Sequence, residues 1–435
     1  MVNVKSLNQR GQRSSSFEHV GYEEDDEFDV LRAHLHELPQ VADQTGIHQH
    51  VGSTVSYGFE VVTFGRPHHC ALGVISSSSA TGGTTSLQRD NKNNSDSTAT
   101  ASTATFRPQR VQEFAQERVL REGSAVAIAA ASHHTLVACR NGDLYVFGLN
   151  KGGRLGLGDD CPQQCPLPRR ILTLKRRKVV AVAAAENHSL CVTMDGMVFA
   201  WGSNQFGQLG DNATGSTGTT SRSIPKPVDD LKQIPCVAVA AGERHSVALS
   251  KEGEVYVWGS NTSGQLGVPR RSGVQKVQRV EALWANGSSS FQQRRKIAIA
   301  IAAADQSTLV LIAPVAGVTQ VNSVYWWGHG NHAPMRVQFE GTKSSTAKLD
   351  LRGAMTATQR LINPVAIACA KYHNAAVTMD GCVYTWGTSS ESLGRDNAKS
   401  PENTRSTTHR ATTSPQLVAG MLPENGGGFA VAVSA

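Results

Sequence analysis

The segment that decides the fold is AAENHSLCVTMDGMVFAWGSNQFGQLG at residues 184–210, because the chain repeats its pattern. In the regular copies a histidine is followed by a turn dipeptide, an aromatic–glycine pair and a Gly-x-Leu-Gly loop. The histidines of four copies are His134, His188, His245 and His373. The glycines of the corresponding aromatic–glycine pairs are Gly148, Gly202, Gly259 and Gly387. A repeat of about 55 residues indicates that one small structural unit is used several times.

Each unit has the pattern of short strands around a tight turn. Asn141-Gly142, Asp195-Gly196 and Asp380-Gly381 are dipeptides that favour two-residue hairpins. The runs that follow them are rich in β-branched and aromatic residues, which favours strands. Ahead of the hairpins lie alanine-rich runs at 127–131, 181–185, 237–241, 299–304 and 365–370. These runs are too short for independent helices, so we expect them to form the innermost strand of each unit.

A proline-containing segment closes each unit. It has a Pro-x-x-Val-like pattern at 108–111, 168–171, 225–228, 334–337 and 415–418. Proline lacks a backbone N–H and is tolerated best in an edge strand, so this segment is expected to be outermost. Four-stranded units of this kind predict an all-β fold, a β-propeller with six recognisable repeat units.

The combined pattern resembles the regulator of chromosome condensation repeat over roughly residues 58–435. The resemblance is strong at 134–156, 188–210 and 245–267, and good at 373–394. It is weak at 305–337, where Ser307 replaces the histidine, and in the first unit. Weak first and fifth units are similar to those in propellers of ubiquitin-ligase adaptors of the inhibitor of Bruton tyrosine kinase type.

The resemblance also implies how the ring closes, because propellers of this family pair N-terminal with C-terminal strands in one blade. Residues 429–435 have the composition of a further inner strand without the rest of its unit. The sequence therefore predicts a propeller that is truncated before ring closure and belongs to a longer protein.

The remaining segments are polar. Residues 1–57 are charged and are expected to be mostly disordered, whereas 58–435 form the propeller with low-complexity insertions at 75–105 and 395–414 and a shorter one at 212–223.

No apolar stretch has signal or membrane length, and the formal net charge is +7. The eight cysteines contain no Cys-x-x-Cys pair, which favours a reducing compartment. We expect an intracellular protein of the cytoplasm or nucleus.

The repeated histidines are expected to be structural. A catalytic site needs one asymmetric group of residues, whereas a residue that recurs in every blade serves something that every blade needs. We expect each histidine to make a hydrogen bond that ties a blade strand to its loop, and Trp201, Trp258 and Trp386 to pack the blades. Cys161 and Cys165 do not have the spacing of a standard zinc half-site. No catalytic residue, cofactor or metal is predicted, and the chain is not expected to be an enzyme.

One basic segment is a candidate partner-binding site. Its cations are Arg169, Arg170, Lys175, Arg176, Arg177 and Lys178. Such a cluster attracts an acidic protein tail, a nucleic-acid backbone or an import receptor. The alternative is a solvated connection between blades whose cations simply face water.

Two functions follow from these observations. The first is a non-catalytic protein-interaction scaffold within a larger regulatory or adaptor protein, with ubiquitin-ligase components among its partners. The alternative, implied by the resemblance, is guanine-nucleotide exchange on a Ran-type small GTPase with chromatin association. Neither hypothesis involves a membrane, and nucleic acid enters only indirectly.

Overall fold

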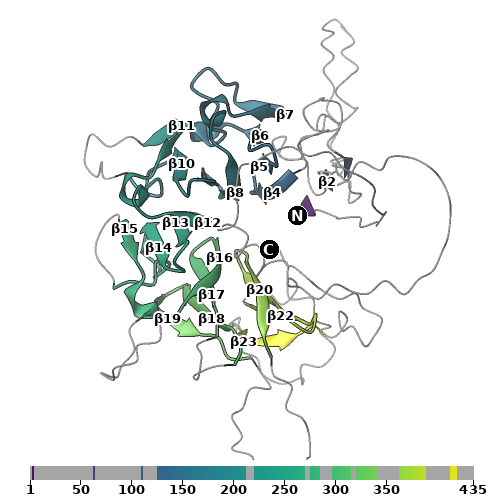
Figure 1. Cartoon of the computed structure of the whole chain (residues 1–435), viewed down its shortest axis with the longest axis vertical. Coiled ribbons are helices and arrows are strands. Elements are labelled where there is room, and N and C mark those ends of the chain that lie inside the picture. Colours follow the sequence, from purple (N-terminus) through teal and green to yellow (C-terminus); the bar gives the residue numbers. More distant parts are fainter. Residues whose placement is uncertain are drawn as a thin grey trace, which may run out of the picture.

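The computed structural model describes 2–3, 62–63, 109–110, 125–211, 220–269, 275–284, 296–314, 320–339, 362–387 and 412–418. These residues form five four-stranded antiparallel sheets and one three-stranded sheet, arranged around an axis (Figure 1). The all-β propeller predicted from the repeats is therefore confirmed. Within the described part of the chain no helix is long and apolar enough to cross a membrane.

The five larger sheets have the same strand order, from the axis outward. The first is β4 (Ala125–Ala130), β5 (His134–Cys139), β6 (Leu144–Leu149) and β7 (Gln164–Arg170). The second is β8 (Val179–Ala184), β9 (His188–Thr193), β10 (Val198–Ser203) and β11 (Ser221–Pro227). The third is β12 (Cys236–Ala241), β13 (His245–Ser250), β14 (Val255–Gly259) and β15 (Gln275–Arg279).

The last two large sheets and the small one complete the set. They are β16 (Ala298–Ala304), β17 (Ser307–Ile312), β18 (Ser323–Gly328) and β19 (Asn331–Arg336), then β20 (Pro364–Cys369), β21 (His373–Thr378), β22 (Val383–Gly387) and β23 (Thr412–Leu417). The small sheet joins β1 (Val2–Asn3), β2 (Val62–Thr63) and β3 (Gln109–Arg110), and β1 lies beside β4. Single-turn 3-10 helices connect three sheets to the next: η5 (Leu172–Leu174), η6 (Asp229–Leu231) and η7 (Glu281–Leu283).

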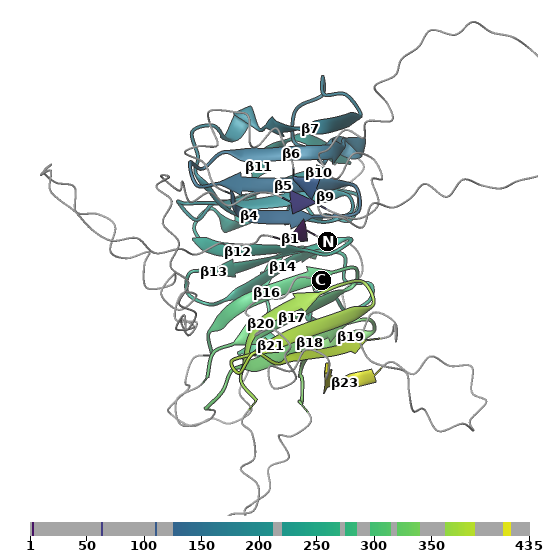
Figure 2. The ribbon, with the colours of Figure 1, turned by 90° about the vertical axis from the view of Figure 1, so that its right-hand side faces the viewer.

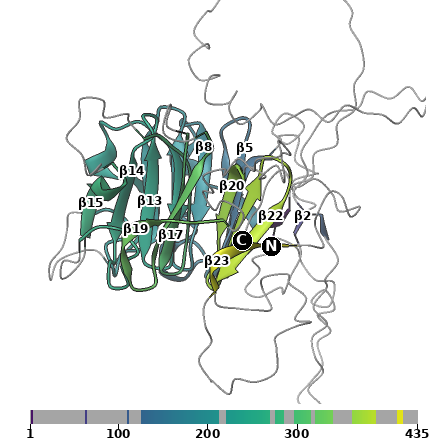
Figure 3. The same cartoon turned by 90° about the horizontal axis from the view of Figure 1, so that it is seen from below.

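The alanine-rich runs form the inner strands β4, β8, β12, β16 and β20, as predicted. Inner strands of successive blades contact one another near the axis (Figure 1). Figure 2 shows the propeller from the side, with the sheets following one another from β7 at the top to β23 at the bottom, and Figure 3 shows strands running along the propeller axis. Small side chains suit this position because the blades converge there and leave little space between backbones.

The glycine of each aromatic–glycine pair sits where two backbones come unusually close. Gly202 has φ 102° and lies opposite His188, at a register shift between β10 and β11. A Cβ at Gly202 would lie 2.6 Å from the carbonyl oxygen of Asn187 and 2.7 Å from the Cα of His188. Only glycine satisfies both the positive φ and the close approach.

The core lies between consecutive blades. Trp201 and Trp258 have no exposed surface, and Trp386 is almost fully buried. Trp258 packs with Leu190 and Val192 of the preceding blade. The three tryptophans thus pack blades together, as the repeat logic predicted.

Two low-complexity ranges need correction. Thr412–Leu417 is strand β23, so the end of the range 395–414 is an outer strand, and Ser221–Pro227 is β11, so 212–223 also ends in a strand. Threonine and serine gave these ends a low-complexity composition, yet threonine is common in β-strands. Residues 1–57 other than 2–3, the insertion 75–105 and the predicted strand at 429–435 lie outside the described residues.

Candidate interaction site

The strands of the propeller end at two different faces. At one, which we call the turn end, lie the hairpin turns between the second and third strands and the connections to the next blade. The backbone N–H of Val179 donates to Gly142 O at 3.1 Å, and that of Cys236 donates to Gly196 O at 2.9 Å. At the other, the loop end, lie the Gly-x-Leu-Gly loops. The basic segment runs from β7 through η5 and therefore lies at the turn end.

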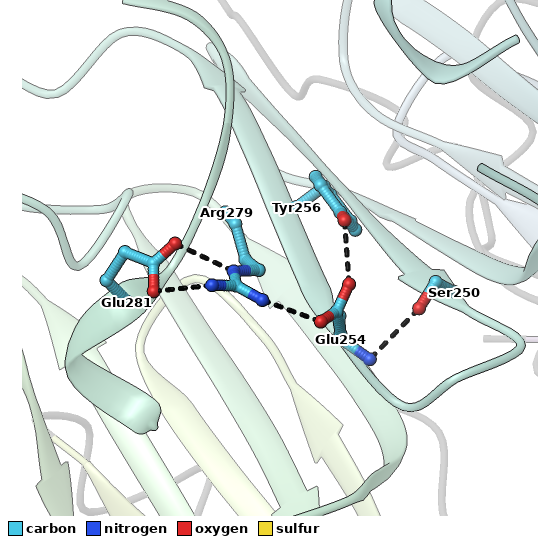
Figure 4. A network of polar contacts seen from close by, with 5 residues as sticks. All are labelled: Ser250, Glu254, Tyr256, Arg279 and Glu281. Carbon is cyan, nitrogen blue, oxygen red and sulfur yellow. Dashed lines mark hydrogen bonds and ion pairs between the residues drawn. The ribbon is translucent and has the colours of Figure 1, made fainter. Parts of the chain in front are cut away.

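Arg170 is occupied by an ion pair within its own blade. Its Nε lies 3.0 Å from Asp143 Oδ1. Arg279 takes the same place two blades along, opposite Tyr256 as Arg170 is opposite Tyr145. The Nη1 of Arg279 donates to Glu254 Oε1 at 2.6 Å (Figure 4). The same arginine–carboxylate pair therefore recurs in two blades, and in each it fixes the outer strand.

Figure 4 shows the polar contacts that extend from the pair of Arg279 and Glu254 in the third large sheet. Arg279 also donates to both carboxylate oxygens of Glu281, at 2.7 and 2.8 Å. The Tyr256 hydroxyl donates to Glu254 Oε2 at 2.8 Å, and the Glu254 N–H donates to Ser250 Oγ at 3.0 Å. The hydrogen bonds that Arg279 donates to Glu281 and Glu254 raise its pKa. Burial, followed by the bond to Glu254, raises the pKa of Tyr256 to about 12. This network holds a blade together.

Arg177 is likewise held by the next blade. Its Nη1 lies 3.0 Å from Asp195 Oδ2, and its guanidinium stands 5.2 Å from the centre of the Phe199 ring. The ion pair and the cation–π contact both fix the guanidinium against the protein. Two of the six predicted cations, Arg170 and Arg177, are thus used by the fold itself.

Three of the other cations lie together with exposed apolar residues and with a further arginine from outside the basic run. Lys175, Arg176 and Lys178 are exposed, and Leu172, at the start of η5, is 72% exposed. Contacts bring two hairpin turns beside Lys178: a Cβ at Gly142 would touch its side chain, and the Met194 N–H donates to its carbonyl oxygen at 2.7 Å. The turn at Gly142 carries the exposed Arg140. We call this surface the turn patch: Arg140, Leu172, Lys175, Arg176, Lys178 and Met194.

Arg169 lies outside the turn patch as defined. It is exposed on the outer strand β7, opposite Val146. Arg140 and Met194 escaped the sequence analysis because they are distant from the basic run in sequence. Their positions in the hairpin turns, at equivalent places just before the turn dipeptide, are the signal that points to this end of the ring.

The repeated histidines link successive blades. His188 Nε2 lies 2.9 Å from Ser246 Oγ of the next blade. The Ser246 hydroxyl donates to Gln208 O at 2.7 Å, and the Trp258 indole N–H donates to the same oxygen at 2.8 Å. Because the hydroxyl donates onward, the Nε2–H of His188 is the donor to it. We call this arrangement the blade relay.

The blade relay occurs in three consecutive copies. The other two are His134, Ser189, Arg154 O and Trp201, and His245, Thr308, Gln265 O and Trp327. The expected bond from a strand to its loop is therefore made through a hydroxyl of the neighbouring blade. The reason is geometric, because each Gly-x-Leu-Gly loop lies against the following blade.

Burial determines the charge of these histidines. Burial lowers the pKa of His134, His188 and His245 to about 3, and it lowers the pKa of the partly buried His373. The three fully buried imidazoles are neutral near pH 7 and have no contact with solvent. They are poorly suited to proton transfer with a substrate.

The described sheets form a β-propeller, and three consecutive segments of the chain match a known repeat. Residues 141–192, 195–249 and 252–311 match the regulator of chromosome condensation (RCC1) repeat. The chain therefore carries repeats of this family, as the resemblance predicted. Its fold is also similar to that of Prp20p from Saccharomyces cerevisiae, with a TM-score of 0.55 and 19% identity over 82% of this chain and 74% of that one. Human WBSCR16 has a TM-score of 0.54 and 19% identity over 72% of this chain and 71% of that one.

Sequence relatives lie among much longer proteins. The E3 ubiquitin-protein ligase HERC2 of Mus musculus is 31% identical over 248 residues, 57% of this chain and 4% of HERC2. The probable E3 ubiquitin-protein ligase HERC4 of Homo sapiens is 37% identical over 142 residues, 33% of this chain and 13% of HERC4. The match thus spans a small fraction of these relatives.

Proposed function

We propose that this propeller is a non-catalytic protein-interaction module, part of a larger regulatory or adaptor protein, that binds an acidic protein segment at the turn patch. The turn patch is the observation that carries the proposal. It combines the exposed cations Lys175, Arg176 and Lys178 with Leu172, whose side chain is largely in solvent. An acidic segment with a large apolar side chain complements both properties.

The structural roles of the repeated histidines and of the paired arginines support the function of an interaction scaffold. Three histidines, a residue type that often serves as an acid or a base, are neutral here and enclosed between blades. The ion pairs of Arg170 and Arg177 leave a rigid frame around cations that remain available to a partner. A rigid frame with exposed connections suits partner binding.

The relatives support the idea of one module in a longer chain. The matched segment is 4% of HERC2 and 13% of HERC4, whose names describe ubiquitin-protein ligases. Ubiquitin-ligase components are therefore among the partners we propose, in the cytoplasm or nucleus. The further likeness to adaptors of the inhibitor of Bruton tyrosine kinase type remains a prediction.

The test is binding of a fluorescent peptide, rich in Glu and Asp with one leucine, to the full chain by anisotropy. We expect Lys175→Glu with Arg176→Glu to weaken binding at least tenfold and Leu172→Ser to weaken it severalfold. Lys232→Glu is the matched control, because Lys232 follows η6 as Lys175 follows η5 and is paired with Asp229 at 2.9 Å. It should leave binding unchanged.

A duplex DNA of similar charge is the competing ligand. Phosphate contacts depend on cations and salt, whereas an apolar contact depends on Leu172. Tighter binding of the duplex, with no effect of Leu172→Ser on either ligand, would replace the protein partner by nucleic acid. Equal binding by the Lys175/Arg176 variant and the unchanged chain would remove the turn patch as the site.

The alternative is an exchange factor for a Ran-type small GTPase with chromatin association. Prp20p, whose fold is similar, is described together with its binding to Gsp1p and histones. An exchange factor differs from a scaffold in one consequence: it accelerates release of the bound nucleotide.

A further inference from the structure

Two cysteines at the loop end of the β4–β7 blade lie in direct contact. The Sγ atoms of Cys161 and Cys165 are 3.3 Å apart. Cys165 is buried at the start of β7, whereas Cys161 is partly exposed in the loop that precedes it. The other five described cysteines are buried. Among the described thiols, this pair alone combines contact with a partner thiol and access from solvent.

The loop that carries Cys161 is held in place at several points. The Asn150 N–H donates to Gln163 O at 2.7 Å and closes the base of the loop. The Gly158 N–H donates to Ser223 O of the next blade at 2.9 Å. Since both thiols start from fixed backbone, a disulfide of about 2.05 Å requires the sulfur atoms to approach by only about 1.2 Å.

We propose that Cys161 and Cys165 form a reversible dithiol–disulfide modification site that responds to peroxide. Hydrogen peroxide oxidises the Cys161 sulfur to a sulfenic acid, and one peroxide oxygen leaves as water. The Cys165 sulfur then attacks Sγ of Cys161, and the sulfenic oxygen leaves as a second water with the Cys165 proton. Two thiols and one peroxide thus yield one disulfide and two waters, and an external dithiol reverses the change.

The environments of the two thiols set their order of reaction. Peroxide reaches Cys161 because its side chain is partly exposed. Burial, followed by the hydrogen bond with Cys161, raises the pKa of Cys165 to about 12, which makes Cys165 a poor first nucleophile. Cys161 is therefore the residue whose sulfur attacks peroxide and becomes the sulfenic acid, and Cys165 is the one that resolves it.

This site is independent of the proposed partner binding. Cys165 lies at the loop end of β7, whereas the turn patch begins beyond the opposite end of that strand. A protein of a reducing compartment can carry such a pair, since disulfides there are transient and often redox-sensing.

The experiment uses the reduced full chain, brief treatment with hydrogen peroxide, denaturation, alkylation and trypsin. Cleavage after Arg154 and Arg169 places both cysteines in one peptide, LGLGDDCPQQCPLPR. We expect this peptide to lose two hydrogen atoms and to take up no alkyl group, and dithiothreitol to restore both alkylation sites. Peptides with the five other described cysteines, all of them buried, should stay alkylated throughout and serve as the internal control.

Two variants separate the roles of the thiols. Cys165→Ser should leave a sulfenic acid at Cys161 that dimedone traps, whereas the unchanged chain should give little adduct. Cys161→Ser should leave Cys165 alkylated after peroxide. The proposal is overturned if the unchanged chain keeps both cysteines alkylated, or if Cys161 proceeds to sulfinic acid while Cys165 stays free. Both of these contradicting results are measured on the unchanged chain, so neither depends on how the variants fold.

Discussion

A single hydroxyl joins two blades in each relay. Ser246 accepts from His188 and donates to Gln208 O, and all these groups are buried. We predict that Ser246→Ala lowers the free energy of unfolding by about 1–3 kcal/mol, because it leaves a buried imidazole N–H unpaired. Denaturant unfolding measures this. Ser246→Thr is the control: Thr308 occupies this position in the next relay, so the hydroxyl is kept and most of the stability with it. Equal losses in both variants would contradict the role of the hydroxyl.

The same residues predict an acid-sensitive fold. His134, His188 and His245 have a pKa of about 3 when folded, against about 6.5 when unfolded. Between these values the unfolded chain binds more protons, so stability falls as pH falls. From pH 7 to pH 5 each histidine should remove about 2 kcal/mol, and the three together about 6 kcal/mol. Urea unfolding across this pH range checks the slope; a free energy of unfolding that stays constant down to pH 5 would show that the imidazoles are not enclosed.

At the scale of the strand, a comparison at Gly202 distinguishes the cost of a positive φ from the cost of a steric clash with a neighbouring backbone. Gly202 and Gly158 have similar φ values, 102° and 96°, but only a Cβ at Gly202 would meet backbone atoms. We predict that alanine costs about 1–2 kcal/mol at either position through the positive φ, and clearly more at Gly202 through the clash. Thermal or urea unfolding of both variants gives the comparison. Equal losses would mean that the close approach to His188 is unimportant.

The strands of the repeat units can be predicted from the sequence because turn dipeptides and alternating side chains are local signals. Asn141-Gly142 and the alanine-rich runs identified hairpins and inner strands correctly. The turn at His329-Gly330 was not predicted: it joins β18 to β19 directly and places His329 at φ 47°. A histidine in that conformation has no clear sequence signal, because the neighbouring blades determine where the chain must turn.

At the scale of the whole molecule, the junction between the fourth and fifth large sheets differs from the three described junctions that precede it. Ser307 replaces the relay histidine and contacts Cys369 at 3.1 Å, while the Asn374 Oδ1 is buried without a hydrogen-bond partner in the described structure. Phe339 packs edge-on against Tyr384 and Trp386 there. We predict that amide hydrogens of β20–β22 exchange with deuterium faster than those of β12–β14, where relays lie on both sides. Exchange measured by mass spectrometry decides this, and equal protection would show that the relay adds little.

The candidate site was only partly predictable at this scale. The cations from Arg169 to Lys178 stand out in the sequence, but their pairing does not. Asp143 and Asp195 reach Arg170 and Arg177 through neighbouring strands and blades. Met194 joins Lys178 through a contact between blades. Such relations depend on how blades stack, which no local pattern encodes.

The measurement that tests the central claim most directly is release of a fluorescent guanine nucleotide from a purified Ran-type GTPase with and without the full chain. A non-catalytic interaction module should leave the release rate unchanged, even at an excess of the chain over the GTPase. Addition of EDTA, which removes magnesium, provides the positive control for release. Acceleration that depends on the concentration of the chain would contradict the account and establish exchange activity.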